Sequence, residues 1–174
     1  MAALEMNSIL HGWNLFADGV AQSLVAETAQ LPSLEESTRD FTPGGGHMGF
    51  AVPLSAINAV EIGFNLVNRS PQLLSLFGLN AGQYRTYTLY ENLVDEFTGD
   101  VTRRVITAIG RLSSVESQEH KSPDLIGYQY RVRSIHTYTD VFDGRVINGF
   151  YFRTNRRIID GVDVTAARNG NLGI

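Results

Sequence analysis

A two-residue alternation of side-chain character runs through residues 128–141 and is the clearest pattern in the chain. One set of alternate positions is mostly aromatic or apolar, and the other set begins with polar side chains. The first set is Tyr128, Tyr130, Val132, Ser134, His136 and Tyr138, and the second begins Gln129, Arg131 and Arg133. Because successive residues of a strand point to opposite faces, this pattern predicts a half-buried β-strand.

An Asp-Gly pair follows this strand and predicts a tight turn. Asp143 and Gly144 lie between two β-type segments. A type I′ turn requires positive φ at both central residues, and Asp-Gly adopts that conformation readily. The sequence therefore predicts a β-hairpin made of residues 127–142 and 145–154.

Other segments also have strand character. The chain is rich in Thr, Val, Tyr and Phe and holds 17 glycines against five prolines, which is typical of a β-rich domain. The further predicted strands lie within residues 13–16, 23–30, 52–66, 84–94 and 101–112, the last two flanking a turn cluster at 97–100.

One short helix is predicted after Ser70. Ser70 is a favourable N-cap, Pro71 suits the first helical position, and Gly78 stands where a helix would stop. The apolar stripe of this helix is Leu73, Leu74 and Phe77.

Two segments fit neither pattern. Residues 31–53 are long for a loop, and four of residues 44–49 are glycine, so we expect an extended arm at about 39–50. The tail, residues 161–174, is weakly periodic and ends on apolar side chains. We expect residues 158–174 to dock onto another surface.

Length and composition indicate one folded domain covering residues 1–174. The 43% of hydrophobic residues and 18% of charged residues exclude a disordered chain. With no cysteine, the chain has no disulfides, no thiolate metal site and no cysteine nucleophile. The net charge of −4 argues against a general nucleic-acid binder. The first 13 residues do not resemble a secretory signal, and residues 50–67 are too polar to span a bilayer.

Charge is distributed unevenly along the chain. Residues 1–40 hold six acidic side chains and one Arg, whereas residues 144–174 hold five Arg and two Asp. Such complementary ends favour head-to-tail association, although an uncorrelated solvated surface explains the same pattern equally well.

No catalytic, cofactor or metal motif emerges. The segment Gly44–Gly49 lacks the Lys-Ser/Thr ending of a phosphate loop, and no amphipathic helix follows it. The four histidines are too widely spaced for a metal motif, and there is no nucleophile elbow. We therefore expect no enzyme activity, no cofactor and no resident metal.

An ordered series of segments resembles the major tail tube protein of contractile-tailed phages, the family that includes the tube of R-type pyocins. The series is Leu15-Phe16 with Asp18-Gly19, Leu31-Pro32-Ser33-Leu34-Glu35, Gly46-His47-Met48, Leu76-Phe77-Gly78-Leu79, Asp143-Gly144, Ile159-Asp160-Gly161-Val162-Asp163, Arg168-Asn169 and Leu172-Gly173-Ile174. It departs from the family in having Phe41-Thr42 before the glycines and Asp160 in place of an Asn.

The resemblance implies a mainly β fold, an antiparallel β-sandwich or partly rolled β-barrel with one short helix and a long arm. It also implies hexameric rings that stack into the inner tail tube, a conduit for DNA inside a contractile sheath. The implied partners are other copies of the chain and the sheath, baseplate and tail terminator proteins. DNA would pass without specific binding, no membrane would be involved, and the protein would belong to the virion after assembly in the host cytoplasm.

Three groups of residues are expected to serve assembly. The arm would cross between rings or subunits through Phe41, Gly44, Gly45, Gly46, Met48 and Phe50. The tail would dock through Leu172 and Ile174. The lumen would be lined by Glu27, Asn58, Glu61 and Asn65, with Arg131 and Arg133 on the opposite side.

Two alternatives remain open from the sequence. A secretion-system tube protein of the Hcp type would share the architecture. A β-sandwich carbohydrate-binding or adhesin domain would instead be monomeric and would expose a Tyr/Trp cluster.

Overall fold

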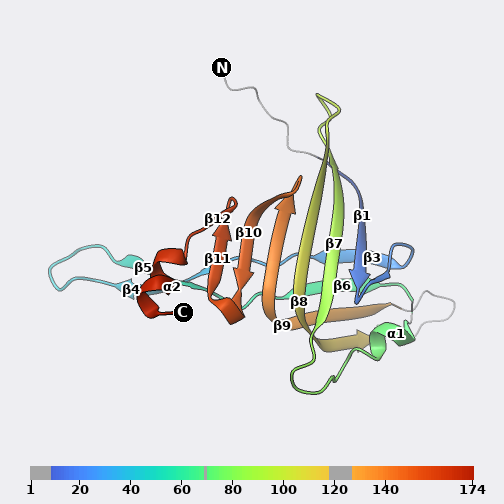
Figure 1. Cartoon of the computed structure of the whole chain (residues 1–174), viewed down its shortest axis with the longest axis horizontal. Helices are drawn as coiled ribbons and strands as arrows, with labels where there is room; N and C mark the ends of the chain where they lie inside the picture. Colours follow the sequence, from blue (N-terminus) through green and yellow to red (C-terminus); the bar gives the residue numbers. More distant parts are fainter. Residues whose placement is uncertain (1–8, 69, 118–126) are drawn as a thin grey trace.

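The computed structural model describes residues 9–68, 70–117 and 127–174 (Figure 1). This part of the chain is mainly β, as the sequence predicts, with one ten-stranded antiparallel sheet and a separate two-stranded ribbon. The strands are β1 (Ile9–Ala17), β2 (Val20–Ala21), β3 (Ala26–Gln30), β4 (Glu36–Phe41), β5 (Phe50–Ile57), β6 (Ile62–Leu66), β7 (Arg85–Val94), β8 (Val101–Ser117), β9 (Tyr128–Phe142), β10 (Arg145–Tyr151), β11 (Arg156–Ile159) and β12 (Val162–Asp163).

The long strands β8 and β9 belong to two layers of the same sheet. In the long layer the order is β12-β11-β10-β9-β8-β7-β1-β2. In the short layer, β3 pairs with β6, β6 pairs with residues 128–132 of β9, and these pair with residues 112–117 of β8. Figure 1 shows β3 and β6 running across the direction of β7 and β8.

The core lies between the two layers. Phe64 of β6 stacks on Tyr130 of β9 with ring centroids 5.2 Å apart, and its ring lies 6.2 Å from that of Tyr87 on β7. All three residues are fully buried. Since β6 and β7 are not hydrogen-bonded neighbours, the contact between Phe64 and Tyr87 joins the short layer to the long one.

The predicted hairpins are present. Asp143 and Gly144 have φ of 45° and 81°, the left-handed values that a type I′ turn requires, and they join β9 to β10. β10 ends at Tyr151 because a single 3-10 turn, η1 (Phe152–Thr154), follows it. β7 and β8 form the second hairpin, and β8 continues five residues past the predicted end at 112 because it pairs with β9 there.

The helix after Ser70 is shorter than predicted. α1 (Pro71–Leu74) is one turn, capped by the Ser70 hydroxyl, which accepts a hydrogen bond from the Leu73 amide. Leu73 is buried, but Leu74 and Phe77 are substantially exposed, so the expected three-residue stripe is wrong. Gly78 has φ of 74° and lies beyond the helix.

Two further predictions need correction. Residues 52–66 do not form one strand, because residues 58–61 separate β5 in the ribbon from β6 in the sheet. A second helix, α2 (Ala166–Leu172), occupies the tail, so the described part of the chain holds two α-helices where the sequence predicts one. The periodicity of α2 is weak because only Asn169 on it is buried.

Candidate assembly surfaces

The arm, residues 36–57, is the most prominent projection of the molecule. β4 and β5 pair antiparallel from Glu36 opposite Ile57 to Phe41 opposite Phe50, and residues 42–49 form the tip. Figure 1 shows the arm extending away from the body. It is longer than the 39–50 predicted, because its two sides are strands.

The apolar side chains near the tip are exposed. Phe41, Met48 and Phe50 are 58%, 79% and 62% accessible. The tip is closed by a hydrogen bond from the Gly46 amide to the Pro43 carbonyl, 2.9 Å long. A Cβ on Gly46 would lie 2.6 Å from Pro43 Cγ, whereas Gly44 and Gly45 have open space around them. The described body of the same chain does not cover these anchors.

The base of the arm is fixed to the body. Arg157 NH1 donates to Glu36 Oε1 at 3.0 Å, and the Asn58 amide donates to the Glu35 carbonyl at 2.9 Å. The Ser37 hydroxyl donates to Asn58 Oδ1 at 2.7 Å. Part of the predicted charge complementarity between the two ends of the chain is therefore satisfied within one subunit.

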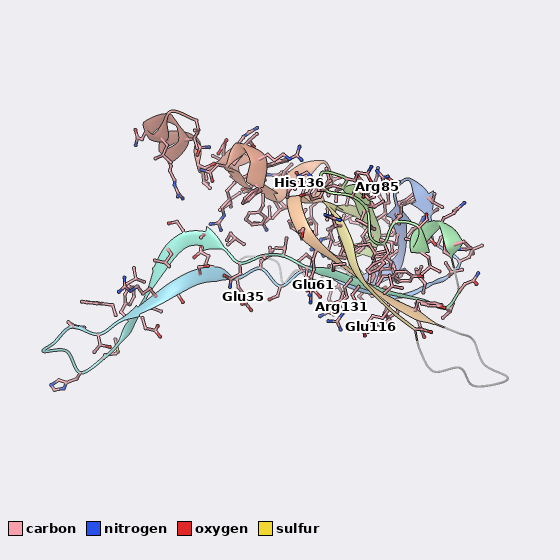
Figure 2. All side chains as sticks on the ribbon, turned by 90° about the horizontal axis from the view of Figure 1, so that it is seen from below. Glu35, Glu61, Arg85, Glu116, Arg131 and His136 are labelled. Carbon is pink, nitrogen blue, oxygen red and sulfur yellow. The ribbon has the colours of Figure 1, made fainter. Side chains whose placement is uncertain are left out.

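The outward surface of the short layer is polar, and we call it the Glu61 face. It carries Glu61, Gly63, Asn65, Gln129 and Arg131, because Gly63 opposes Arg131 and Asn65 opposes Gln129 in register. Figure 2 shows Glu61, Arg131 and Glu116 on this same side of the strands.

The predicted separation of acidic and basic side chains is wrong. Glu61 Oε2 accepts from Arg133 Nε at 2.6 Å, and Glu61 Oε1 lies 3.9 Å from Arg131 NH1. Alternation within one strand shows which residues share a face, but the relation between two strands depends on register. The chain alone did not give the register of β6 against β9.

The other residues proposed for the lumen lie near this face. Asn65 is on it, and exposed Glu27 occupies a bulge in β3 beside the Thr28–Asn65 pair. Asn58 is exposed but hydrogen-bonds to the arm base. Whether these residues face a lumen stays a prediction.

The tail begins inside the sheet. β11 pairs with β10, β12 pairs with β11, and α2 follows. The helix is held by Asn169, whose side chain is buried and bonds both the side chain and the carbonyl of Asn155 at 2.8 and 2.9 Å. Hydrogen bonds from Thr165 and Arg156 lower the pKa of Asp163 below its ordinary value. Leu172 and Ile174 remain exposed, and their docking stays a prediction.

Within residues 9–68, 70–117 and 127–174, no three His, Asp or Glu side chains gather as metal ligands would. No helix in these ranges is long and apolar enough to cross a membrane.

Comparison with known families identifies the chain. The profile of the family described as phage tail tube protein FII matches residues 7–173. The chain belongs to this phage tail tube family. A comparison with curated protein sequences gave no match.

Solved structures share the fold of this tail tube protein. A chain of the sheath-tube complex of an extracellular contractile injection system, PVC, in the extended state superposes with a TM-score of 0.58 at 11% identity, covering 80% of this chain and 94% of that one. A chain of the PVC sheath/tube terminator structure gives 0.55 at 11% identity, covering 80% and 99%. A chain of the anti-feeding prophage tube-terminating cap gives 0.51 at 12% identity, covering 76% and 89%.

The tail tube protein also carries an ion-pair network that sequence patterns did not reveal. Arg104 on β8 donates from Nε and NH2 to Asp140 on β9 at 2.9 and 2.8 Å, and from NH1 to Glu91 on β7 at 3.1 Å. Both carboxylates are buried. Hydrogen bonding to Asp140 raises the pKa of Arg104 above its ordinary value, so the cation is permanent. The only sign of this network in the sequence is one charged residue on the mostly apolar face of each of β7, β8 and β9.

Proposed function

We propose that this protein is the subunit of a contractile-tail inner tube, in which six copies form a ring and rings stack around a lumen for DNA ejection. Membership of the tail tube family supports a structural, non-enzymatic role. It also favours this role over a monomeric carbohydrate-binding domain. A secretion-system tube protein of the Hcp type, the other alternative, would share the tube architecture but would serve a secretion system instead of a phage tail.

The observation that carries the proposal is a pair of free strand edges on the short layer. Among the described residues, β3 pairs only with β6. Within the described ranges, residues 113–116 of β8 pair only with β9, and one bridge joins the preceding Leu112 to Phe77. Exposed edges with unpaired backbone groups readily accept another strand. The edge of β8 at residues 113–116 and the edge of β3 therefore suit a joint between copies.

The strand directions of these two edges are compatible. The short layer runs β3-β6-β9-β8 with every neighbouring pair antiparallel, so β3 and β8 run in opposite directions. A β3 edge placed beside the β8 edge of another copy continues the antiparallel pattern. Repeated around a ring, this joint places one face of all short layers toward the axis. We propose that the Glu61 face is that face.

The composition of the Glu61 face and its surroundings suits a conduit. Glu27, Glu61 and Glu116 stand against Arg131 and Arg133, and Glu61 already engages both guanidinium groups. Proteins hold DNA mainly through uncompensated Lys and Arg on its phosphates. A wall with paired arginines and an acidic excess would let DNA pass without retention.

The proposed partners follow from the assemblies in which similar folds occur. The structures described above come from a sheath-tube complex, a tube terminator and a cap, and a further match, with a TM-score of 0.51 at 9% identity, comes from an injection-system baseplate. We propose a sheath around this tube and baseplate and terminator proteins at its ends. The protein would be part of the virion, assembled in the host cytoplasm.

Electron microscopy of the concentrated, purified protein tests the function. We expect rings with six-fold symmetry or hollow tubes built from them. Monomers at every concentration, or rings of another symmetry, would contradict the proposal.

A further inference from the structure

A pocket of about 590 Å³ lies between the arm base, the end of β10 and the start of α2, where no described part of the chain fills it. Aliphatic and small polar residues of the arm base form one part of its wall, aromatic residues and three Arg form another, and no Asp or Glu lines it. The lining residues that carry the argument are Tyr84, His136, Phe152, Arg156, Arg157 and Arg168. His136 and Tyr84 meet edge to face with ring centroids 4.7 Å apart.

The cations of this pocket are only partly neutralised. Arg157 pairs with Glu36 at 3.0 Å and Arg156 with Asp163 at 2.8 Å. No ion pair of Arg168 occurs among the described residues, and Arg168 is exposed. Arg153 adds another cation, 5.8 Å above the Tyr84 ring. The pocket therefore has room for an anionic group beside an aromatic wall.

The turn between β7 and β8, residues 95–100, has the complementary character. It carries three acids, Asp95, Glu96 and Asp100, and no Lys or Arg. Between them stands Phe97, 74% exposed. A protruding aromatic residue among acids matches a pocket lined by aromatic residues and arginines.

This turn is already ordered in the free subunit. Asp95 Oδ1 accepts from the amides of Phe97 and Thr98 at 2.8 and 3.1 Å. The Asp95 amide donates to the Asp100 carbonyl at 2.9 Å, and His11 Nε2 lies 2.8 Å from Glu96 Oε1. Because a preorganised turn loses little conformational freedom on docking, it suits a repeated contact.

Within one subunit the turn and the pocket are far apart. Figure 1 shows the turn at the upper tip of the β7–β8 hairpin, whereas η1, which lines the pocket, lies at the lower end of β10. A meeting of the two therefore requires a second copy. Different patches on the two partners make the contact heterologous, and such a contact repeats to form a closed ring or an open filament.

We propose that the β7–β8 turn of one subunit inserts Phe97 into this pocket of a second subunit, with its acids facing Arg168 and Arg156. The inference rests on the proposed tube function and names one of its subunit contacts. The other prominent apolar projection, the arm tip, carries one Asp and one Arg near its apolar anchors and lacks the acidic excess that the pocket favours.

Charge exchange between turn and pocket tests the contact. We expect Glu96→Arg and Arg168→Glu each to raise the protein concentration needed for tube assembly by at least about tenfold, since like charges then face each other. The double variant, Glu96→Arg with Arg168→Glu, should assemble at a protein concentration within about threefold of that of the wild type. In it, opposite charges again face each other across the contact. All three should keep the wild-type melting temperature, as both residues are exposed.

A mismatched double variant provides the control. Arg145→Glu with Glu96→Arg has the same net charge as the matched pair, but Arg145 lies at the start of β10, outside the pocket and the arm. We expect it not to restore assembly. Equal recovery in both doubles, no recovery in the matched double, or normal assembly of Glu96→Arg would each overturn the contact. Tube formation by the wild type tests the function separately, so the contact can fail while the function stands.

Discussion

Tyrosine side chains fill much of the core of this subunit. Tyr87, Tyr130 and Tyr138 are fully buried, and no hydrogen-bond partner for the hydroxyls of Tyr87 and Tyr130 occurs in the described structure. Burial raises the pKa of Tyr87 and Tyr138 to about 12 from 10.0, because a phenolate is poorly solvated there. These tyrosines therefore act as large apolar residues at neutral pH.

The raised pKa values predict a stability loss in alkali. The unfolded tyrosines ionise near 10.0 and the folded Tyr87 and Tyr138 near 12. Folding stability is therefore unaffected below the unfolded pKa and falls as pH rises from about 10 to about 12. Ultraviolet titration at rising pH should show these two ionising with unfolding, whereas Tyr87→Phe should retain more stability at pH 11. Equal losses in wild type and Tyr87→Phe would contradict this.

The buried network predicts a large effect of one Arg substitution. Arg104→Met leaves Glu91 and Asp140 buried without their cation and should reduce the free energy of unfolding by about 3–5 kcal/mol. Urea unfolding measures the loss. The matched control, Arg103→Met, removes an exposed guanidinium 5.0 Å above the Tyr90 ring and should cost about 1 kcal/mol or less. Similar losses in the two variants would show that the network does not stabilise the fold.

At the scale of elements, the arm and the tail differ in how they join the body. The arm is fixed at its base, and its two strands make no ladder with the main sheet. The tail adds β11 and β12 to the sheet before α2 packs through Asn169. Removing either distal part therefore leaves the packing between the two layers intact.

Deletion of Gly44–Gly49 should give a folded subunit that does not elongate. The expected reason is loss of the tip that carries Met48, while the core and the arm base remain. Circular dichroism checks folding and electron microscopy checks tubes. Gly12→Ala is the control, since Gly12 lies on β1 outside the arm with open space around it, and it should assemble normally. Tubes of normal length from the deletion would exclude this role.

Truncation after Gly161 should block assembly with little change in melting temperature. It removes β12 and α2, including exposed Leu172 and Ile174, but leaves β11 paired with β10. Thermal unfolding and microscopy of the same sample separate the two effects. Ile174→Ser with Leu172→Ser should reproduce the assembly defect without the truncation. A large fall in melting temperature would instead assign the tail to its own core.

Local sequence features predicted some elements well and others badly. The β9–β10 hairpin was predictable because alternation and the Asp143-Gly144 turn are both local signals. The presence of both acidic and basic side chains on the Glu61 face was not predictable, because it depends on the register between β6 and β9, which are far apart in the sequence. The strands of the arm were hidden for another reason. Both of their faces are largely exposed, so no buried side imposes an alternation on them.

At the scale of the whole molecule, the free edges, the arm and the β7–β8 turn point away from the core in different directions (Figure 1). One core can therefore support contacts within a ring and between rings at once. The Glu61 face remains open on the side opposite His136 and Arg85, as Figure 2 shows. The proposed inner wall and the proposed joints therefore lie on separate surfaces.

The charge of the Glu61 face, the proposed inner wall, predicts whether assembled tubes bind DNA. Wild-type tubes should not retain short double-stranded DNA in co-sedimentation at about 0.15 M salt, because uncompensated phosphate contacts are lacking. Glu27→Lys with Asn65→Lys should create retention that falls as salt rises. Retention of DNA by wild-type tubes, or no retention by the variant tubes, would show that the Glu61 face does not line the lumen.

The arm has a consequence for when tubes begin to grow. A two-stranded ribbon without a covering layer is only marginally stable in water, and ordering each residue costs about 1–2 kcal/mol. For two free subunits this cost would oppose the first encounter, whereas on the proposed tube a finished ring would offset it by binding the arm. Purified protein would then form tubes after a delay, and added tube fragments would shorten that delay.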